Sequence, residues 1–338
     1  MGDVDETALR GWLVANVAGL PDAPMELEVL SGGHSNVTCS VTIGDQELVV
    51  RMPPATAFLP TANDVGREHR FYAALQDTAV PTPRVLGLCA DPAVVGAPFY
   101  VMERLHGVVP HDPSVLDGLS ADGGRALSEQ LVDVLAQIHA TDRHAVGLGG
   151  EGRPDGYLER QVARWTDQWH RATDHDDATI DELARRLGQA IPTSPPATIV
   201  HGDYRLGNLM VDAATRAQVV GVLDWEMATI GDPLADLGYT LLYWGTAGRP
   251  AIHPSQGCAD LPGFLTADEL IDRYARTTGL TVDHVTFYIV LAAFKLTIIG
   301  AGNLARMRRA GRIDAATGDV DRARIPLAEW ALELWGTS

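Results

Sequence analysis

A segment near the middle of the chain, HGDYRLGNLMVDAATRAQVVGVLDWE, concentrates side chains that can do chemistry. Residues 209–211 and 219–223 are rich in branched apolar side chains and are predicted to be β-strands. Asp203 and Asn208 then lie in a loop held by a rigid sheet, and Asp224 ends the second strand. One base beside two hard oxygen ligands for magnesium is the set of groups that phosphoryl transfer requires. The segment therefore predicts a phosphoryl-transfer site.

The motifs in this segment resemble those of a known family. HGDYRLGN has the spacing of the kinase catalytic loop HRDxxxxN, and LDWE stands where kinases carry DFG. Together with GDPLADLG, they resemble the aminoglycoside phosphotransferase and choline kinase family, a small-molecule branch of the protein-kinase fold. SGGHSN, LVVRMPP and HGDYRLGNLMV are closest to the kinase-like domains that are associated with some acyl-CoA dehydrogenases.

This resemblance implies an α+β, bilobal protein-kinase-like fold. Residues 1–105 would form a nucleotide-binding lobe with an antiparallel five-stranded sheet and a helix. Residues 106–338 would form a larger, mostly helical lobe that carries the catalytic loop and the acceptor site. The implied cofactors are ATP and Mg²⁺, and the implied reaction moves the γ-phosphate to a hydroxyl of a small molecule.

The resemblance also assigns roles within the central segment. Asp203 would accept or orient the hydroxyl proton of the acceptor, and Asn208 and Asp224 would supply oxygen ligands to magnesium. His201 would brace the catalytic loop through hydrogen bonds. Asp236, in GDPLADLG, would anchor the backbone of this loop from behind.

The residues that bind the nucleotide are expected in the first third of the chain. Gly33 and Ser35 lie in a predicted glycine hairpin that would cover the nucleotide phosphates. Arg51 stands where kinases carry a phosphate-binding lysine, and Glu68 matches the glutamate that pairs with it. Arginine keeps the positive charge, although its reach and geometry differ from those of lysine. Glu226 stands where DFG has glycine, and a role in metal or water binding is left open.

Hydrophobic periodicity predicts the elements that position these groups. The adenine ring would contact backbone groups near Glu103 and Leu105, at the hinge between the lobes. Strands are expected at residues 25–30, 36–43, 47–52, 84–89 and 99–104. Helices are expected at residues 5–18, 63–76, 125–139, 154–172, 178–190, 237–244, 267–278, 282–305 and 322–334.

A helical region before the catalytic loop covers the acceptor site in this family. Trp165 and Trp169, with Asp174, Asp176 and Asp177 in the turn that follows, are therefore candidates for acceptor contact. A solvated turn between two helices explains the three acids equally well.

Composition bounds the class of protein. The net charge of −18 opposes binding to nucleic acid or to an anionic membrane, and it weakly favours a cationic ligand. The sequence has no secretory signal, so a cytoplasmic protein is expected. The apolar run 287–305 is interrupted by Lys295, the only lysine, and is better explained as a core helix than as a membrane span. The oligomeric state is left open.

Two other functions remain open from the sequence. A metal-dependent hydrolase could use His201, Asp203 and Asp224 as ligands, but Arg51 and Glu68 would then have no role. A nucleotide-binding pseudokinase is conceivable because the usual lysine is missing, although the intact acids oppose it. The acceptor is narrowed only to an aminoglycoside-like molecule, a macrolide, a choline-like alcohol, a sugar or a hydroxyacyl-CoA.

Overall fold

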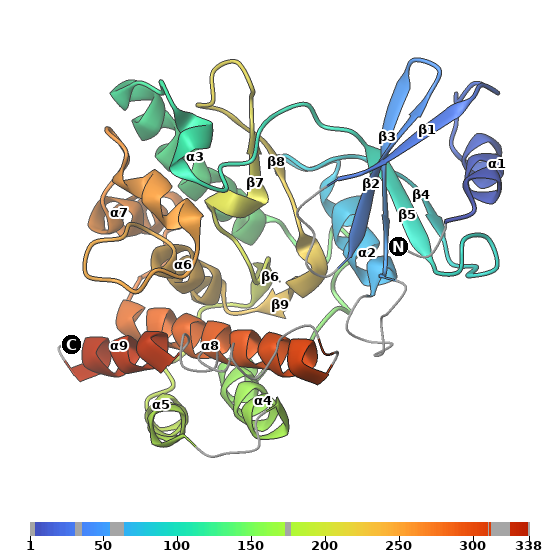
Figure 1. The fold of residues 1–338 in the computed structure, drawn as a ribbon. Coiled ribbons are helices and arrows are strands. Elements are labelled where there is room, and N and C mark those ends of the chain that lie inside the picture. Colours follow the sequence, from blue (N-terminus) through green and yellow to red (C-terminus); the bar gives the residue numbers. More distant parts are fainter. Residues whose placement is uncertain are drawn as a thin grey trace.

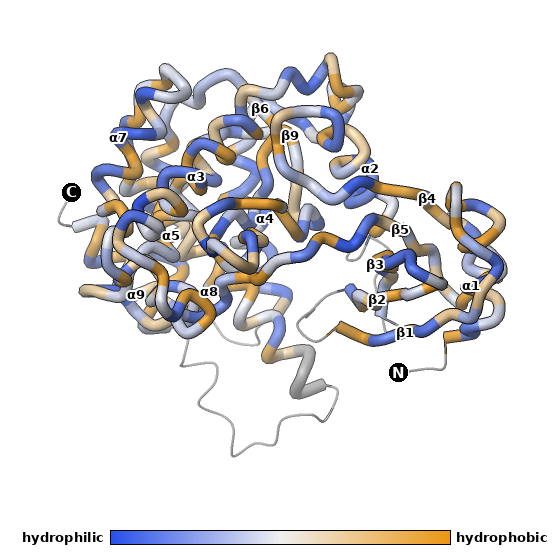
Figure 2. Tube along the Cα trace, turned by 90° about the horizontal axis from the view of Figure 1, so that it is seen from above, coloured by the Kyte–Doolittle hydropathy of each residue, from blue (hydrophilic) through white to orange (hydrophobic). Residues whose placement is uncertain are grey.

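The protein consists of two lobes that lie side by side in a computed structural model (Figure 1). The structure describes residues 4–30, 36–54, 64–172, 177–309, 311 and 325–336. One lobe contains a β-sheet and the other is mostly helical, and the view from above shows the same division (Figure 2). The expected α+β fold class, with a five-stranded antiparallel sheet in one lobe, is therefore confirmed.

The small lobe is built on five antiparallel strands. They are β1 (Met25–Val29), β2 (Val37–Ile43), β3 (Gln46–Met52), β4 (Val85–Cys89) and β5 (Phe99–Glu103). Their order in the sheet is β1-β2-β3-β5-β4. The strand order places β3 at the centre, where Arg51 lies opposite Tyr100 of β5.

A helix covers each face of this sheet, α1 (Glu6–Asn16) on one side and α2 (Val65–Leu75) on the other (Figure 1). Side chains alternate along a strand, and β5 shows the consequence. Phe99 and Val101 belong to the buried cluster that includes α1, whereas Tyr100 and Met102 belong to the cluster that includes α2. The sheet is therefore buried on both faces, and α2 is the helix that faces the large lobe.

The large lobe is formed by helices around two small β-ribbons. The helices are α3 (Ala121–Ala140), α4 (Tyr157–Ala172), α5 (Ala178–Gln189), α6 (Pro233–Leu242), α7 (Ala267–Thr278), α8 (Val285–Arg309) and α9 (Ile325–Gly336). The ribbons pair β6 (Thr198–Val200) with β9 (Thr229–Gly231), and β7 (Leu209–Val211) with β8 (Val219–Val222). Short 3₁₀ helices are η1 (Pro113–Leu116), η2 (Leu206–Asn208), η3 (Trp225–Met227) and η4 (Pro254–Asp260).

Helix α8 is the apolar segment noted in the sequence. Val285–Ala305 is long and apolar enough to span a membrane, and 78% of its most apolar stretch is buried inside the protein. It packs against α4, α6 and α9. The apolar character of α8 is thus explained by its place in the core, as expected.

Two helices begin four residues earlier than the periodicity predicted. Helix α3 begins at Ala121, because the Ser120 side chain accepts a hydrogen bond from the Gly123 backbone N–H and caps the helix. Helix α6 begins at Pro233, with Asp232 as its N-cap. Capping residues set both starts, whereas hydrophobic spacing finds only the buried face of a helix.

One buried cluster extends through both lobes. Phe71 and Tyr72 of α2 belong to the same cluster as Trp225 of η3. The Phe71 and Trp225 rings stack with their centroids 6.4 Å apart. The boundary near residue 105 stays a prediction, but the lobes on either side of it share apolar contacts.

Candidate active site

The loop after β6 is held from beneath by one buried carboxylate. Asp236, in the first turn of α6, is fully buried and accepts hydrogen bonds from the backbone N–H groups of His201 and Gly202, both at 2.7 Å. Burial alone would raise the pKa of Asp236, but hydrogen bonds, with that from His139 foremost, lower it. An ionised Asp236 therefore anchors the loop, as expected from the sequence.

His201 braces the same loop through both ring nitrogens. Its Nδ1 accepts from the Asp203 backbone N–H at 3.2 Å, so Nε2 carries the proton and donates to the Leu223 carbonyl at 2.9 Å. Neither nitrogen has a free lone pair for a metal ion. No group of three or more His, Cys, Asp and Glu side chains suited to a metal occurs in the described part of the chain. The ligand cluster expected for a hydrolase, at His201, Asp203 and Asp224, is therefore not formed.

Asp203 and Asn208 face each other across the loop. The 3₁₀ turn η2 brings Asn208 back so that its side-chain nitrogen donates to the Asp203 backbone carbonyl at 2.8 Å and to Asp203 Oδ2 at 2.7 Å. The other carboxylate oxygen, Asp203 Oδ1, is buried and lies 3.5 Å from Arg205 Nε. The Asp203 carboxylate is therefore held by Asn208 on one side and faces Arg205 on the other, and as a fixed carboxylate it can orient a substrate hydroxyl and accept its proton.

Asp224 reaches the same region from the β7–β8 ribbon. Leu223 N–H donates to the Asn208 carbonyl at 2.9 Å, so Asn208 and Asp224 lie at the same end of this ribbon. Asp224 has a left-handed backbone, with φ 66° and ψ 62°, which aspartate tolerates better than most residues. Its backbone N–H donates to the Tyr72 hydroxyl of α2 at 3.1 Å. The bend turns the Asp224 side chain toward the small lobe.

Arg51 joins the small lobe to Asp224. Arg51 Nη2 lies 2.5 Å from Asp224 Oδ1, and Nε lies 3.1 Å from Glu68 Oε2. Glu226 Oε2 lies 3.9 Å from the same Nη2. Burial by itself would lower the pKa of Arg51, but the charges of Glu68 and Asp224 raise it. Arg51 therefore makes the ion pair expected of the kinase lysine, and one guanidinium faces three carboxylates.

The donor set at this place fits a hard divalent cation. The side-chain nitrogen of Asn208 is engaged with Asp203, so its amide oxygen is the ligand atom that Asn208 offers. Asp224 adds a carboxylate whose side chain is 30% exposed. Two protein oxygen ligands, with water completing the shell, are what magnesium uses beside nucleotide phosphates.

Glu68 should give the folding stability a measurable dependence on pH. Burial raises the pKa of Glu68 from 4.5 to about 7, although Arg51 opposes this shift. The folded protein then binds the Glu68 proton more tightly than the unfolded chain, so stability falls as pH rises from about 4.5 to 7. Because glutamine mimics the protonated form, wild type should lose up to about 3 kcal/mol relative to Glu68→Gln between pH 5 and 8.

Thermal unfolding of both proteins at pH 5, 6, 7 and 8 measures this difference. The two unfolding temperatures should nearly coincide at pH 5 and separate at higher pH. A gap that stays constant, or that widens toward low pH, would contradict the assignment of the shift to Glu68.

Four other residues were predicted to bind the nucleotide: Gly33, Ser35, Glu103 and Leu105. Gly33 and Ser35 lie outside the described residues. At the hinge, the backbone N–H of Glu103 donates to the Arg84 carbonyl, and its side chain accepts from the Arg84 N–H, both at 2.9 Å. A nucleotide contact at Glu103 would therefore involve its carbonyl group. Leu105 packs over Gly221 of β8, where a Cβ atom would lie 2.4 Å from the Leu105 side chain.

The two tryptophans considered for acceptor contact are core residues. Trp165 and Trp169 are 3% and 4% exposed and lie on the buried face of α4. Asp177 caps α5 by accepting from the Thr179 N–H, whereas Asp174 and Asp176 lie outside the described residues. Asp177, the acid of this turn that the structure describes, therefore has a structural role.

Two cations beside Asp203 were missed by the sequence reasoning. Arg205 Nε lies 3.5 Å from Asp203 Oδ1, and its guanidinium lies 5.1 Å from the centre of the Tyr243 ring. Its position two residues after Asp203 was the available signal. Lys295 of α8 donates a hydrogen bond to the Gly202 carbonyl. No motif pointed to Lys295, and only its being the sole lysine marked it out.

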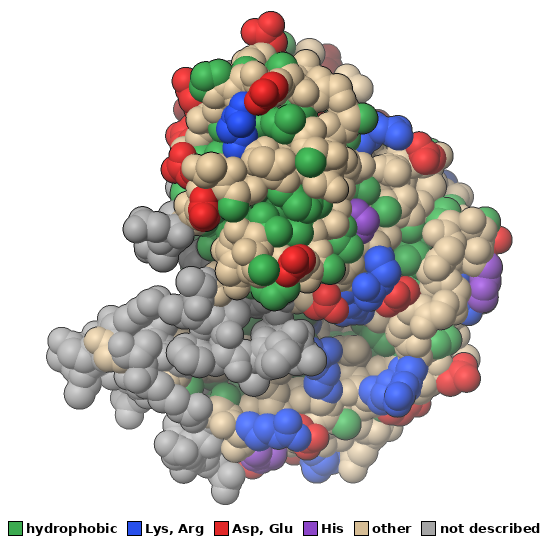
Figure 3. Space-filling view, turned by 90° about the vertical axis from the view of Figure 1, so that its right-hand side faces the viewer, with side chains coloured by type: hydrophobic (Ala, Val, Ile, Leu, Met, Phe, Trp, Pro, Cys, Tyr) green, Lys and Arg blue, Asp and Glu red, His purple; other side chains and the backbone are tan. Residues whose placement is uncertain are grey.

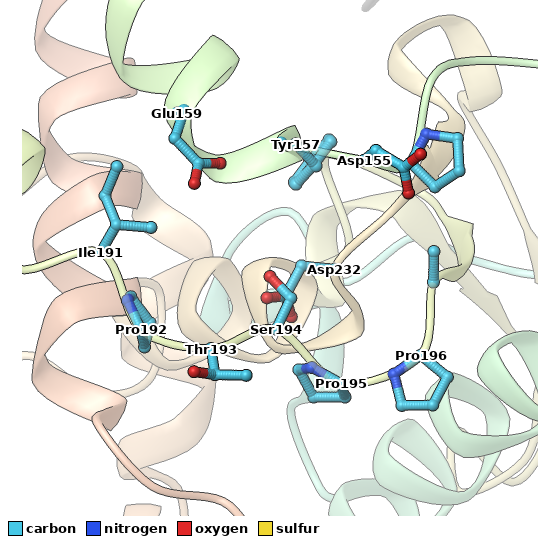
Figure 4. A pocket seen from close by; sticks show the side chains of 13 residues that line it. Asp155, Tyr157, Glu159, Ile191, Pro192, Thr193, Ser194, Pro195, Pro196 and Asp232 are labelled. Atoms are coloured by element: carbon cyan, nitrogen blue, oxygen red, sulfur yellow. The ribbon is translucent and has the colours of Figure 1, made fainter.

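A separate cavity of about 650 Å³ lies between the start of α4 and residues 191–197 (Figure 4). The side chains of Asp155, Glu159 and Asp232 line it. Asp232 is engaged in structure, since it caps α6 and accepts from the Tyr288 hydroxyl at 2.9 Å. None of the residues discussed around Asp203 lines this cavity, which is distinct from the candidate active site.

Comparison with known proteins gives one family. Residues 26–270 match the family described as "Phosphotransferase enzyme family". The chain is 35% identical over 304 residues to acyl-CoA dehydrogenase family member 10 of Mus musculus, covering 89% of this chain and 28% of that protein. It is 33% identical to acyl-CoA dehydrogenase family member 11 of Gallus gallus, covering 98% of this chain and 43% of that protein. The chain thus spans less than half of the length of these relatives, and the resemblance to kinase-like domains associated with acyl-CoA dehydrogenases is confirmed.

Solved structures agree with this result. A Ralstonia eutropha protein, provisionally named an aminoglycoside phosphotransferase, superimposes with a TM-score of 0.83 at 31% identity, covering 99% of both chains. The aminoglycoside phosphotransferase APH(4)-Ia, in a complex with ADP and hygromycin B, gives a TM-score of 0.62 at 17% identity, covering 96% of this chain and 98% of that chain. At that identity the second match shows the shared fold alone.

Proposed function

Since the chain belongs to the phosphotransferase enzyme family and is a small-molecule phosphotransferase, we propose that its phosphoryl donor is ATP, bound with Mg²⁺. The observation that carries this proposal is the convergence of two pairs at one end of the β7–β8 ribbon. Asp203 with Asn208 forms one pair, and Asp224 with Arg51 forms the other. ATP is also the donor that fits the neighbours, because related structures are described as complexes with ADP and AMP-PNP.

On the acceptor side, Asp203 is proposed to orient the attacking hydroxyl and to accept its proton. Its Oδ2 is held by Asn208, and its Oδ1 is buried in the loop. A base held in this way costs no reorganisation when the acceptor arrives. Arg205 lies beside Oδ1 and keeps positive charge close to the place where the phosphoryl group would pass.

On the donor side, Arg51 is proposed to contact the nucleotide phosphates while Glu68 holds its guanidinium in place. Asn208 and Asp224 are proposed to hold Mg²⁺, which supplies neutralising charge to the phosphate oxygens when bound. Backbone groups at Glu103 and Leu105 are proposed to face the adenine ring. The predicted contacts of Gly33 and Ser35 with the phosphates belong to the same proposal.

The acceptor is proposed to be an aminoglycoside-like molecule or a hydroxyacyl-CoA. The first is favoured by the structural neighbours, whose descriptions name aminoglycosides. The second is favoured by relatives that are described as acyl-CoA dehydrogenase family members. The fold does not decide between them, since one fold serves many substrates.

A nucleotide-consumption screen tests the proposal. The protein would be offered amino sugars, macrolides, choline and hydroxyacyl-CoAs, with ATP or GTP and with or without Mg²⁺, and Asp203→Asn would serve as the control. We expect ATP consumption that needs an acceptor, Mg²⁺ and Asp203. Phosphate release without any acceptor would favour a hydrolase instead. Nucleotide binding without consumption would favour a pseudokinase, against which the intact Asp203, Asn208 and Asp224 argue.

We also propose a cytoplasmic protein whose partners are a nucleotide and a small molecule rather than nucleic acid or a membrane. The net charge of −18 supports this proposal. On the face shown in Figure 3, Lys and Arg side chains lie among Asp and Glu side chains instead of forming one basic patch. Retention on a heparin column at low salt would count against it.

A further inference from the structure

Lys295 is the only lysine in a chain that has 26 lysine and arginine residues. It lies on α8, the apolar helix in the core of the large lobe. An ammonium group in such a place is costly unless it is paired and hydrogen-bonded. The groups that contact the Lys295 ammonium therefore indicate the function of this buried positive charge.

The Lys295 ammonium group holds the peptide group that joins Gly202 to Asp203. It donates a hydrogen bond to the Gly202 carbonyl, while the Gly202 N–H donates to Asp236 Oδ1 at 2.7 Å. Gly202 is thus held at both ends, by a cation from α8 and by an anion from α6. No side chain of its own restrains it.

Gly202 needs such a restraint because its backbone is unusual. Its φ is +83°, and a Cβ atom at this position would lie 2.7 Å from the Met227 carbonyl. A glycine is therefore required here, and glycine has more conformational freedom than other residues. The direction in which the Asp203 side chain leaves the loop depends on how firmly this peptide is fixed.

The surroundings of Lys295 are built for a positive charge. The Tyr239 and Trp165 ring centres lie 4.7 Å and 5.9 Å from its Nζ. Burial lowers the pKa of Lys295, while the charges of Asp203 and Asp236 oppose this shift. The cation therefore lies in the aromatic layer behind the loop, on the α4 and α6 side rather than on the Arg51 side.

We propose that Lys295 is a positioning residue, which fixes the Gly202 carbonyl and so keeps Asp203 aimed at the acceptor hydroxyl. This rests on the role proposed for Asp203. It predicts a loss of turnover without a loss of nucleotide binding, because Arg51, Asp224 and Asn208 are untouched. A residue that merely fills the core would instead weaken all functions together.

Lys295→Met tests the proposal, because methionine has a similar length but neither charge nor donor. We expect kcat to fall by about 10- to 100-fold, as a small misplacement of a catalytic group can cause, with the nucleotide Kd unchanged. Lys295→Arg keeps charge and donors and should restore kcat to within several-fold of wild type. Arg171→Met, which removes a cation from the exposed end of α4, is the matched control and should change nothing.

Lys295→Gln is the second neutral variant and retains a polar donor in case the methionine variant does not fold. Its kcat should also fall, with the unfolding temperature and nucleotide Kd as checks on folding. An unchanged kcat in a neutral variant would overturn the proposal. So would an arginine variant that folds and binds nucleotide but is as slow as the neutral variants.

Hydrogen–deuterium exchange separates this proposal from the proposed function. The peptide spanning residues 198–210 should exchange faster in Lys295→Met, while small-lobe peptides should not change. If wild type transferred no phosphate to any acceptor but this exchange still rose, the proposed function would fail and the fixing of Gly202 would stand. Equal exchange in both proteins would overturn the positioning role.

Discussion

Asp203→Asn should lower turnover by about 10²- to 10⁴-fold, the usual scale of a general-base contribution. Asparagine has the same shape and still offers an oxygen to the Asn208 side chain, which donates to Asp203 Oδ2 at 2.7 Å. It cannot take up a proton, however, and it removes the charge that faces Arg205 at 3.5 Å. The loss should therefore appear in kcat, with nucleotide binding nearly intact.

Steady-state kinetics with a saturating acceptor measures this loss. Asp212→Asn is a matched control at the turn between β7 and β8, because the Asp212 side chain accepts hydrogen bonds from Ala214 and Thr215 of that turn. It should leave turnover within a few-fold of wild type. A nearly unchanged turnover in Asp203→Asn would contradict the role assigned to Asp203.

Asp224→Ala should abolish nucleotide binding that depends on magnesium. The change removes one of the two proposed protein ligands of the metal and also the carboxylate that lies 2.5 Å from Arg51. Isothermal calorimetry with ATP, in the presence of Mg²⁺ and then of a chelator, measures the effect. Wild type should bind in the first condition only, and the variant in neither.

A second variant separates chemistry from backbone strain. The left-handed backbone at residue 224, with φ 66°, is unfavourable for alanine but accessible to asparagine. Asp224→Asn should therefore fold like wild type and still bind the magnesium nucleotide weakly. Unaltered binding in both variants would exclude Asp224 as a ligand.

The sequence predicted the parts of the site that depend on local spacing. Asp203 and Asn208 are five residues apart in one loop, so their contact follows from a single 3₁₀ turn. The Arg51 and Glu68 pair joins a strand to the next helix, and it was predicted because both residues match positions of the kinase pattern. The helix starts that the caps Ser120 and Asp232 set were missed because capping residues, unlike buried faces, have no periodicity.

The parts that were not predicted depend on packing between distant elements. Lys295 and Gly202 are 93 residues apart, and nothing in the spacing of either segment shows that α8 passes behind the catalytic loop. Trp165 and Trp169 were considered for acceptor contact because aromatic residues suit both a binding surface and a core. Their exposed fractions of 3% and 4% in the structure show that both side chains belong to the core.

The hydrogen bond between the Tyr72 hydroxyl and the Asp224 N–H has a mechanical consequence. It runs from α2 of the small lobe to the proposed metal ligand, and the stacking of Phe71 on Trp225 adds a second tether beside it. Any rocking of the small lobe must therefore either carry Asp224 along or break both tethers. Closure of the two lobes would therefore also move the Asp224 carboxylate. A substitution on the face of α2 that contacts the large lobe would change both the closure and the position of Asp224.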